Sequence, residues 1–169
     1  MMEYQSCFDI IGPIMVGPSS SHTAGVVLIG KFIYELIGEH PEEVTIIFYD
    51  SFAETYQGHG TDKALLGGLL GMHPDDARIK YASSLANQYG IRVTFHFEDS
   101  CPYFEHPNTT VVTTKLGDYE LKVGGVSLGG GLSKIFMING EKMDIRLSAS
   151  VDVSKYISCC SSYIRKVNV

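Results

Sequence analysis

The sequence predicts an α+β fold of two layers, in which helices pack on one mixed β-sheet within a single domain. Up to about residue 98, helical segments alternate with runs of β-branched and aromatic residues. From residue 110 to residue 147, short strands follow one another with tight turns between them, which is typical of a β meander. Elements mixed in this way bury their apolar faces when the helices pack on the sheet.

The first apolar segment predicts a helix over residues 23–37. Apolar side chains lie on most of its faces, so we expect this helix to be buried on more than one side. Gly38 ends it, because glycine readily adopts the left-handed conformation that closes a helix. A strand is expected over residues 44–49, where every residue is β-branched or aromatic.

Two further helices are expected over residues 62–70 and 74–89. Gly67 and Gly68 lower the helix propensity of the first, yet they would allow another backbone to approach closely. The second begins at Pro74, which suits the first helical position. Its expected core-facing stripe is Ala77, Tyr81, Leu85 and Tyr89, with Ala82 and Ala86 alongside.

The remaining strands are expected over residues 91–98, 110–116, 119–126, 134–138 and 142–147. Alternating apolar and polar residues in the first of these predict one buried and one exposed face. Asn139-Gly140, between the last two, is the strongest hairpin signal in the chain. Residues 150–169 show no clear period and are expected to form a short helix or a tail, so the domain itself is expected over residues 1–149.

The composition excludes several classes of function. The formal charge is −6, from 13 basic and 19 acidic residues, and no Lys/Arg-rich block exists to neutralise phosphates. This argues against binding to nucleic acid or to an anionic membrane surface. No apolar run reaches the length of a transmembrane helix. The N-terminal segment lacks the basic residues of a signal peptide, so the expected location is the cytoplasm.

The cysteines and histidines do not predict a metal site on this chain. The four cysteines are Cys7, Cys101, Cys159 and Cys160, and they form no Cys-x-x-Cys pair. In a cytosolic protein they are expected to be free thiols rather than a disulfide framework. No two histidines have a spacing that is typical of a zinc site.

The first candidate site is the segment 17–25, at the start of the first helix. Its polar side chains belong to Ser19, Ser20, Ser21, His22 and Thr23. One serine would suffice to cap the helix, so this set exceeds the structural requirement. Exposed N–H groups at a helix N-terminus bind anions, and these side chains would add donors for a small carboxylate or phosphate. Helix capping alone is the alternative.

The second candidate site is a glycine turn that contains a histidine. The turn consists of Gly58, His59, Gly60, Thr61, Asp62 and Lys63. The flanking glycines would let the His59 imidazole approach a ligand closely, and Asp62 would orient the ring and fix its tautomer. A histidine that titrates near neutral pH is suited to removing a proton beside a carboxylate. A turn that merely leads into a helix is the alternative.

Two weaker motifs follow in the second half of the chain. His106, Pro107, Asn108 and Thr109 form a polar turn before a strand. Residues 127–131 begin with Ser127 and end with three successive glycines, which would permit left-handed turns or a close backbone approach.

These four motifs, in this order, resemble the β chain or β domain of the bacterial iron–sulfur-dependent L-serine dehydratases. The resemblance covers roughly residues 5–148, and the first two motifs together are its most specific part. That β domain is in turn similar to the allosteric substrate-binding domain of some phosphoglycerate dehydrogenases. Many β chains continue into a regulatory ACT domain, and the residues from 151 onward show no ACT pattern.

The resemblance implies an L-serine ammonia-lyase, which forms pyruvate and ammonia without pyridoxal phosphate. A [4Fe–4S] cluster on an α subunit would activate the serine hydroxyl as a Lewis acid, so this chain would be inactive alone. His59 would be the base for the α-proton, and His22 a partner of the carboxylate or the hydroxyl. The other implied substrate-binding residues are Ser19, Ser20, Ser21, Thr23, Gly58, Gly60, Thr61, Asp62, Lys63, His106 and Asn108.

The expected partners are therefore the α subunit and L-serine, without nucleic acid or membrane, and a homodimer is left open. Two other functions stay under consideration. One is an allosteric domain that binds serine or another small anion without chemistry, and the other is a free-standing phosphate-binding protein. The turn around His59 disfavours the phosphate-binding protein, because phosphate binding gives that histidine no role. The sequence does not separate the catalytic subunit from the allosteric domain.

Overall fold

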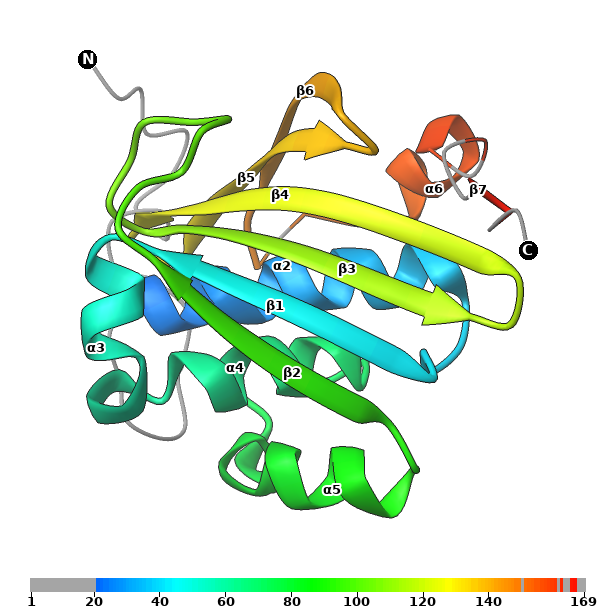
Figure 1. The fold of residues 1–169 in the computed structure, drawn as a ribbon, viewed down its shortest axis with the longest axis horizontal. Helices are drawn as coiled ribbons and strands as arrows, with labels where there is room; N and C mark the ends of the chain where they lie inside the picture. The colour runs from blue at the N-terminus through cyan, green and yellow to red at the C-terminus, as the bar shows by residue number, and fades with distance from the viewer. Residues whose placement is uncertain (1–20, 150, 161, 163–164, 167–169) are drawn as a thin grey trace.

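The structure is a computed structural model that describes residues 21–149, 151–160, 162 and 165–166, with the side chains at the start of the first helix described from Thr23 onward. Within these residues, seven strands form one sheet (Figure 1). They are β1 (Glu43–Tyr49), β2 (Arg92–Glu98), β3 (Thr109–Leu116), β4 (Tyr119–Gly129), β5 (Leu132–Ile138), β6 (Glu141–Leu147) and β7 (Arg165–Lys166).

The sheet is mixed, as the sequence predicts. Neighbouring strands follow the order β2-β1-β3-β4-β5-β6, and the short β7 pairs with β4. β2 lies parallel to β1, whereas the other pairs are antiparallel. The predicted hairpin between β5 and β6 is confirmed, because Asn139 and Gly140 have φ values of 48° and 86°, as a type I′ turn requires.

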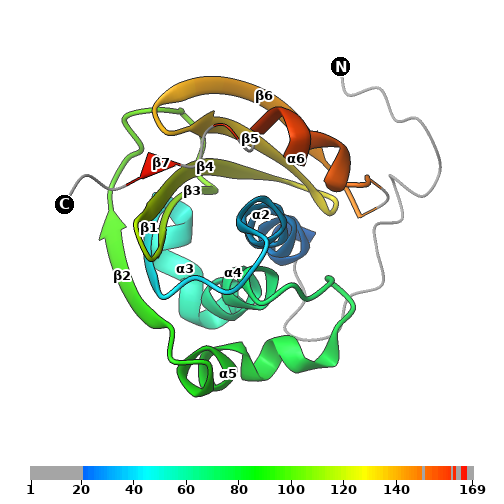
Figure 2. The same ribbon diagram turned by 90° about the vertical axis from the view of Figure 1, so that its right-hand side faces the viewer.

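The helices pack on one face of this sheet, which confirms the predicted fold class. They are α2 (Ser21–Ile37), α3 (Ser51–His59), α4 (Thr61–Leu69), α5 (Ala82–Gln88) and α6 (Ser154–Cys160), with a 3₁₀ helix η1 (Ala77–Tyr81) before α5. Figure 2 shows α2 enclosed between the curved sheet and α4, with α5 beyond α4. Val26, Ile29 and Phe32 of α2 are fully buried, so the prediction of burial on more than one side is correct.

Glycines allow α2 and α4 to touch backbone to backbone. A Cβ on Gly68 would collide with the carbonyl oxygen of Val27 and would lie 2.9 Å from the Cα of Gly30. A Cβ on Gly30 would in turn collide with the carbonyl oxygen of Leu65. The close approach expected from the glycine pair of α4 is therefore real for Gly68, whereas a Cβ on Gly67 would meet the side chain of Ile79.

The opposite face of the sheet carries a smaller apolar cluster beneath the loop of residues 99–108. Its buried members are Tyr49, Val111, Val126, Phe136 and Met137. Phe104 of the loop stacks on Phe136, with ring centroids 4.8 Å apart, and Cys101 packs beside it. Apolar contacts fix this loop, and the loop therefore holds His106 and Asn108 at its end in place.

Two predicted features of the helical half are wrong. Residues 74–89 form η1 and then α5 rather than one helix, because Asp76 caps a 3₁₀ turn by accepting a hydrogen bond from the Arg78 N–H at 2.9 Å. The division leaves Tyr81 and Tyr89 of the expected stripe each 57% exposed. The expected burial of Ala82 and Ala86 is confirmed, and Ile79 is buried with them.

Helix α3 has no counterpart among the predicted elements. Its sequence contains no helical period of apolar residues, and Phe52 is its buried side chain. Within the described part of the chain, no helix is long and apolar enough to span a membrane.

Candidate active site

The motifs singled out in the sequence gather where β1 ends and α2 begins (Figure 1). The hydroxyl group of Thr23, in the first turn of α2, donates a hydrogen bond to the carbonyl oxygen of His59 at 3.3 Å. These residues are 36 positions apart in the sequence, so the fold brings the first two motifs into direct contact. Ser19 and Ser20 lie outside the described residues, and so do the side chains of Ser21 and His22.

His59 is held at a bend between two helices. Gly60 has φ 65° and ψ 29°, and it is at once the residue that closes α3 and the residue that opens α4. Its N–H donates to the carbonyl oxygen of Tyr56, and its carbonyl accepts from the N–H of Ala64 at 2.9 Å. The imidazole of His59 is exposed. Gly60 is therefore required for its backbone conformation, whereas a Cβ on Gly58 would meet no atom within 4 Å.

Asp62 does not contact His59 by any hydrogen bond in the described residues. Its Oδ1 is buried and has no hydrogen-bond partner there. Thr61, at the start of the same helix, is buried, and Lys63 is exposed. Because a buried carboxylate oxygen without a partner is costly, and the described residues supply none, the position suits an acceptor that a bound donor would complete.

The His106 turn is tied to both α3 and β4. The backbone N–H of Phe52 donates to the carbonyl oxygen of Pro107 at 3.3 Å. The N–H of Ser127, on β4, donates to the carbonyl oxygen of Asn108 at 3.0 Å. Inside the turn, Nδ1 of His106 accepts a hydrogen bond from the Asn108 N–H at 3.2 Å. A neutral His106 must then carry its proton on Nε2, so the ring acts as a donor through that atom.

The glycines of the fourth motif close the turn between β4 and β5 beside α2. Gly129, Gly130 and Gly131 have φ values of 84°, 62° and 75°, so the predicted left-handed conformation is confirmed at all three. A Cβ on Gly25 of α2 would lie 2.5 Å from the hydroxyl oxygen of Ser127 and 2.8 Å from the carbonyl oxygen of Leu132. The fourth motif therefore supports the start of α2 by close packing.

Asp50 was missed in the sequence and has the most strained backbone near this site. It joins β1 to α3 with φ 49° and ψ −127°, a combination that a residue with a Cβ seldom adopts. Its N–H donates to the carbonyl oxygen of Glu98 at 3.1 Å, and its carbonyl accepts from the N–H of Ala53 at 2.9 Å. No sequence signal at Tyr49-Asp50-Ser51 indicated this conformation. Strain of this kind is often found beside functional residues.

Comparison with known proteins decides the family. Residues 6–115 match the family model described as serine dehydratase beta chain. The chain belongs to this family. The matched residues contain the first three of the four motifs, including the two that are joined through Thr23 and His59.

Similar proteins are named as serine dehydratases from several bacteria. The chain is 49% identical to the probable L-serine dehydratase beta chain of Bacillus subtilis, over 88% of this chain and 66% of that protein. It is 40% identical to the L-serine dehydratase beta chain of Peptoniphilus asaccharolyticus, over 92% of this chain and 70% of that protein. L-serine dehydratase 2 of Escherichia coli is 32% identical over 88% of this chain, but the match covers 36% of the longer protein. This family member therefore spans about two thirds of the two beta chains.

The described residues of this serine dehydratase beta-chain family member do not fit an iron–sulfur cluster. No group of three His, Cys, Asp or Glu side chains among them is placed to hold a metal ion. Among the described cysteines, Cys101 is half-buried and Cys160 is buried, and neither forms a disulfide there. Cys7 and the side chain of Cys159 lie outside the described part.

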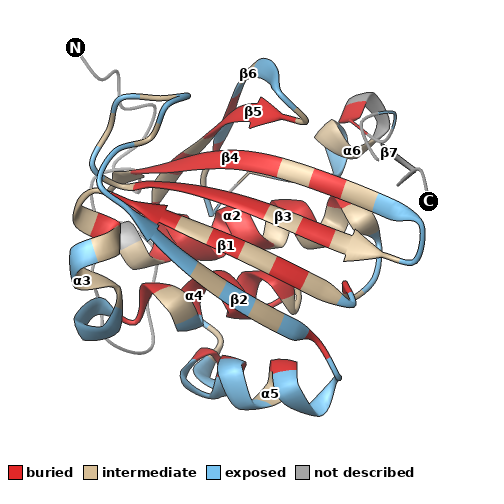
Figure 3. Cartoon of the chain, in the orientation of Figure 1, coloured by how far each residue is buried: buried red, intermediate tan, exposed pale blue. Residues whose placement is uncertain are grey.

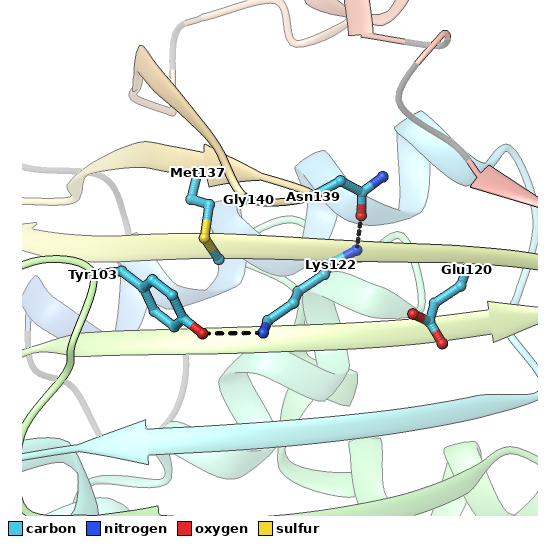
Figure 4. A pocket seen from close by; sticks show the side chains of 6 residues that line it. All are labelled: Tyr103, Glu120, Lys122, Met137, Asn139 and Gly140. Atoms are coloured by element: carbon cyan, nitrogen blue, oxygen red, sulfur yellow. Dashed lines mark hydrogen bonds between the residues drawn. The ribbon is translucent and has the colours of Figure 1, made fainter.

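A separate hollow lies on the outer face of the sheet, away from the motifs (Figure 4). It has a volume of about 270 Å³ and is lined by Tyr103, Glu120, Lys122, Met137, Asn139 and Gly140. Nζ of Lys122 donates to the hydroxyl oxygen of Tyr103 at 3.4 Å, and the Lys122 N–H donates to Oδ1 of Asn139 at 2.8 Å. None of the site residues predicted from the sequence lines this hollow.

Proposed function

We propose that this chain is one part of an L-serine ammonia-lyase and supplies substrate-binding and acid–base groups to an active site shared with an α subunit. Membership of the beta-chain family supports the chemistry. The observation that carries the proposal is the Thr23–His59 hydrogen bond, because it joins a helix N-terminus suited to a carboxylate to a histidine suited to take a proton. The relatives' names supply L-serine as the substrate.

In this proposal, the start of α2 holds the substrate carboxylate. The first N–H groups of a helix have no partner within the helix, and the positive end of its dipole favours an anion. In the sequence, Ser19 and Ser20 precede this helix of 17 residues, and Ser21 and His22 begin it. Their hydroxyl and imidazole groups would be further donors to the carboxylate. Holding the carboxylate and offsetting its charge lowers the energy of the carbanion that forms beside it.

His59 is the proposed base for the α-proton. Its imidazole is exposed, while its backbone is fixed by the hydrogen bond from Thr23 and by the left-handed conformation of Gly60. The ring can therefore reach a substrate on the open side of the site without moving the chain that carries it. A base needs this combination of free ring and fixed backbone to hold its nitrogen within hydrogen-bond reach of one proton.

Two further side chains, those of His106 and Asp62, are proposed to contact the substrate. His106 donates through Nε2, since its Nδ1 already accepts from Asn108, and it therefore suits an oxygen of the substrate. The buried Oδ1 of Asp62 suits the substrate ammonium group, which would supply the missing donor. Gly58 precedes His59 and is exposed like Lys63, whereas Thr61 is buried; all three are proposed to contribute to substrate binding.

The overall reaction balances without another reagent. The α-proton passes to His59, the hydroxyl group leaves Cβ and departs as water after gaining a proton, and the resulting aminoacrylate tautomerises to an imine that water converts to pyruvate and ammonia. No residue of this chain is assigned to the departure of the hydroxyl group. The [4Fe–4S] cluster of the proposal belongs to the α subunit, and we place the complex in the cytoplasm.

The test is co-expression with a candidate α chain under anaerobic conditions. We expect the two chains to co-purify, to be brown and to release pyruvate from L-serine. In D₂O, the His59→Ala complex is expected to exchange the serine α-proton at least about 100-fold more slowly than the unmodified complex, the usual contribution of a general base. His73→Ala is the matched control, because His73 is also exposed but lies outside every motif.

The same samples separate the catalytic subunit from the alternative allosteric domain. Unchanged proton exchange in the His59→Ala complex removes His59 from the proposed role. Calorimetric binding of L-serine to this chain alone, together with no turnover in the presence of any α chain, favours a binding domain without chemistry.

A further inference from the structure

Strand β2 is an edge of the sheet, and its outer side has no neighbouring strand among the described residues (Figure 1). Figure 3 shows no buried residue along β2: Val93 and Phe95 are half-buried, and the strand is exposed at its other positions, including His96 to Glu98. Residues 92–98 contain no proline or lysine, the residues with which natural proteins commonly block a free edge. Figure 2 shows α5 below β2, near the end where the strand begins and on the helical side of the sheet.

The hydrogen-bonding groups that face outward can be assigned from the two ends of the strand. The N–H of Arg92 donates to the carbonyl oxygen of Glu42 at 2.9 Å, and the carbonyl oxygen of Glu98 accepts from the N–H of Asp50 at 3.1 Å. Both ends of β2 therefore direct their backbone groups toward β1. Since these groups alternate along a strand, the N–H and C=O groups of Val93, Phe95 and Phe97 point away from the sheet.

We propose that β2 pairs in antiparallel fashion with β2 of a second copy of this chain, about a two-fold axis at Phe95. In this register Phe95 lies opposite Phe95 of the partner subunit, and Val93 lies opposite Phe97 of the partner subunit. All three outward-facing residues then exchange both of their backbone hydrogen bonds. The two sheets become one continuous sheet, and the interface is isologous, as a two-fold dimer requires.

The charges on the exposed face select this register. Arg92 lies opposite Glu98 of the partner subunit, and this pair occurs twice. Arg92 already contacts Glu43 within its own chain, but its side chain is 71% exposed there, so the guanidinium fork has room for a second carboxylate. Shifting the register by two residues in one direction puts His96 opposite Arg92, and in the other direction puts His96 opposite itself.

The other edge of the sheet does not have this self-complementarity. Pairing β6 with itself over its full length would place Lys142 opposite Arg146 and Asp144 opposite itself, so like charges would face each other. β2 also supplies apolar surface to the proposed interface. Phe97 is 42% exposed, and its ring lies beside that of Tyr56, with centroids 4.4 Å apart. A ladder of one strand from each chain is small for an interface, so we expect a weak, concentration-dependent dimer.

The experiment measures association of the full chain by sedimentation velocity over about a 100-fold range of concentration. The wild-type chain is expected to shift from monomer to dimer. Glu98→Arg places two arginines opposite each other at both ends of the ladder and is expected to weaken association at least about tenfold. Glu54→Arg is the matched control, because Glu54 is an exposed glutamate on α3, and it should associate like the wild type. A wild-type chain that stays monomeric, or a Glu98→Arg dimer of unchanged strength, overturns the proposal.

Cysteine cross-linking tests the register independently. Thr94 and His96 are exposed, and in the proposed register each lies opposite the other across the interface, where Cα atoms are about 4.5 Å apart, within the range that a disulfide spans. Mixing Thr94→Cys chains with His96→Cys chains under mild oxidation should give a 94–96 cross-link, identified by peptide mapping, whereas neither variant alone should. A cross-link that forms equally in either variant alone contradicts this register. Neither experiment depends on catalysis, so both test the dimer independently of the proposed function.

Discussion

Gly68→Ala is expected to destabilise the protein although alanine is the better helix former. In an exposed helix this change would gain about 1 kcal/mol. Here the new Cβ would collide with the carbonyl oxygen of Val27 and would lie 2.8 Å from the backbone nitrogen of Lys31. Both neighbours are backbone atoms of α2, which is buried against the sheet, so no side chain can rotate away and the two helices must separate.

Overpacking of this kind costs about 1–3 kcal/mol or more, and contact with backbone puts Gly68→Ala at the upper end. After subtraction of the helix gain, we expect a net loss of about 2 kcal/mol in the free energy of unfolding. For a chain of 169 residues, this corresponds to a fall of roughly 4–8 °C in Tm. Urea unfolding followed by circular dichroism measures the loss of free energy, and a thermal scan measures the fall in Tm.

Gly67→Ala and Gly58→Ala are the matched controls. A Cβ on Gly67 would meet the side chain of Ile79 at 2.9 Å, and one on Gly58 would meet nothing within 4 Å. We therefore expect a smaller loss for the first and a gain of up to about 1 kcal/mol for the second. A Gly68→Ala protein as stable as the wild type would show that α2 and α4 do not cross as closely as described.

Three further changes test the surroundings of the site. Asp50→Gly should raise the free energy of unfolding by about 1 kcal/mol in urea titrations, because glycine relieves a φ of 49°, whereas Asp50→Ala should give no gain. Thr23→Val should lower kcat of the reconstituted enzyme about tenfold by releasing the backbone of His59, and Thr23→Ser should restore most of it. Burial, reinforced by Cys101, Tyr103 and Glu98, raises the pKa of Tyr49 from 10.0 to about 12. The unfolded chain therefore loses this proton first, and stability should fall as pH rises from 10 through 12. Replacing Tyr49 by Phe should remove that part of the loss, and an unchanged alkaline unfolding profile would contradict it.

Strong local patterns made most of the fold predictable. The spacing of apolar residues within the strands and α2 predicts these elements. Asn139-Gly140 predicts its turn because both residues readily adopt positive φ values. The failures lie where the decisive forces are not local. Residues 74–89 divide because Asp76 caps a 3₁₀ turn, and α3 is held by its neighbours, with Phe52 as its buried contact.

For the candidate site, residue types carried a hypothesis that contacts can only partly address. Serine, histidine and glycine at these spacings indicated a site for a small carboxylate or phosphate, which stays a prediction, and the structure brings Thr23 and His59 into contact. The expected orientation of His59 by Asp62 has no hydrogen bond to support it, since Oδ1 of Asp62 is buried without a partner in the described chain. Which atom a carboxylate faces depends on the packing of α4 against α2, and the spacing of residues 59–62 contains no information about that packing.

The contrast between α2 and α3 makes His59 a junction between a buried helix and a largely exposed one. The amide hydrogens of α2, enclosed by sheet and helix, should exchange with solvent only when the whole domain unfolds. Those of α3, whose buried side chain is that of Phe52, should exchange through local opening at far lower cost. A ligand that bridges the start of α2 and His59 would close that opening. Binding would then be visible as slower deuterium uptake throughout Ser51–His59, including the residues of α3 before His59 that do not touch the ligand.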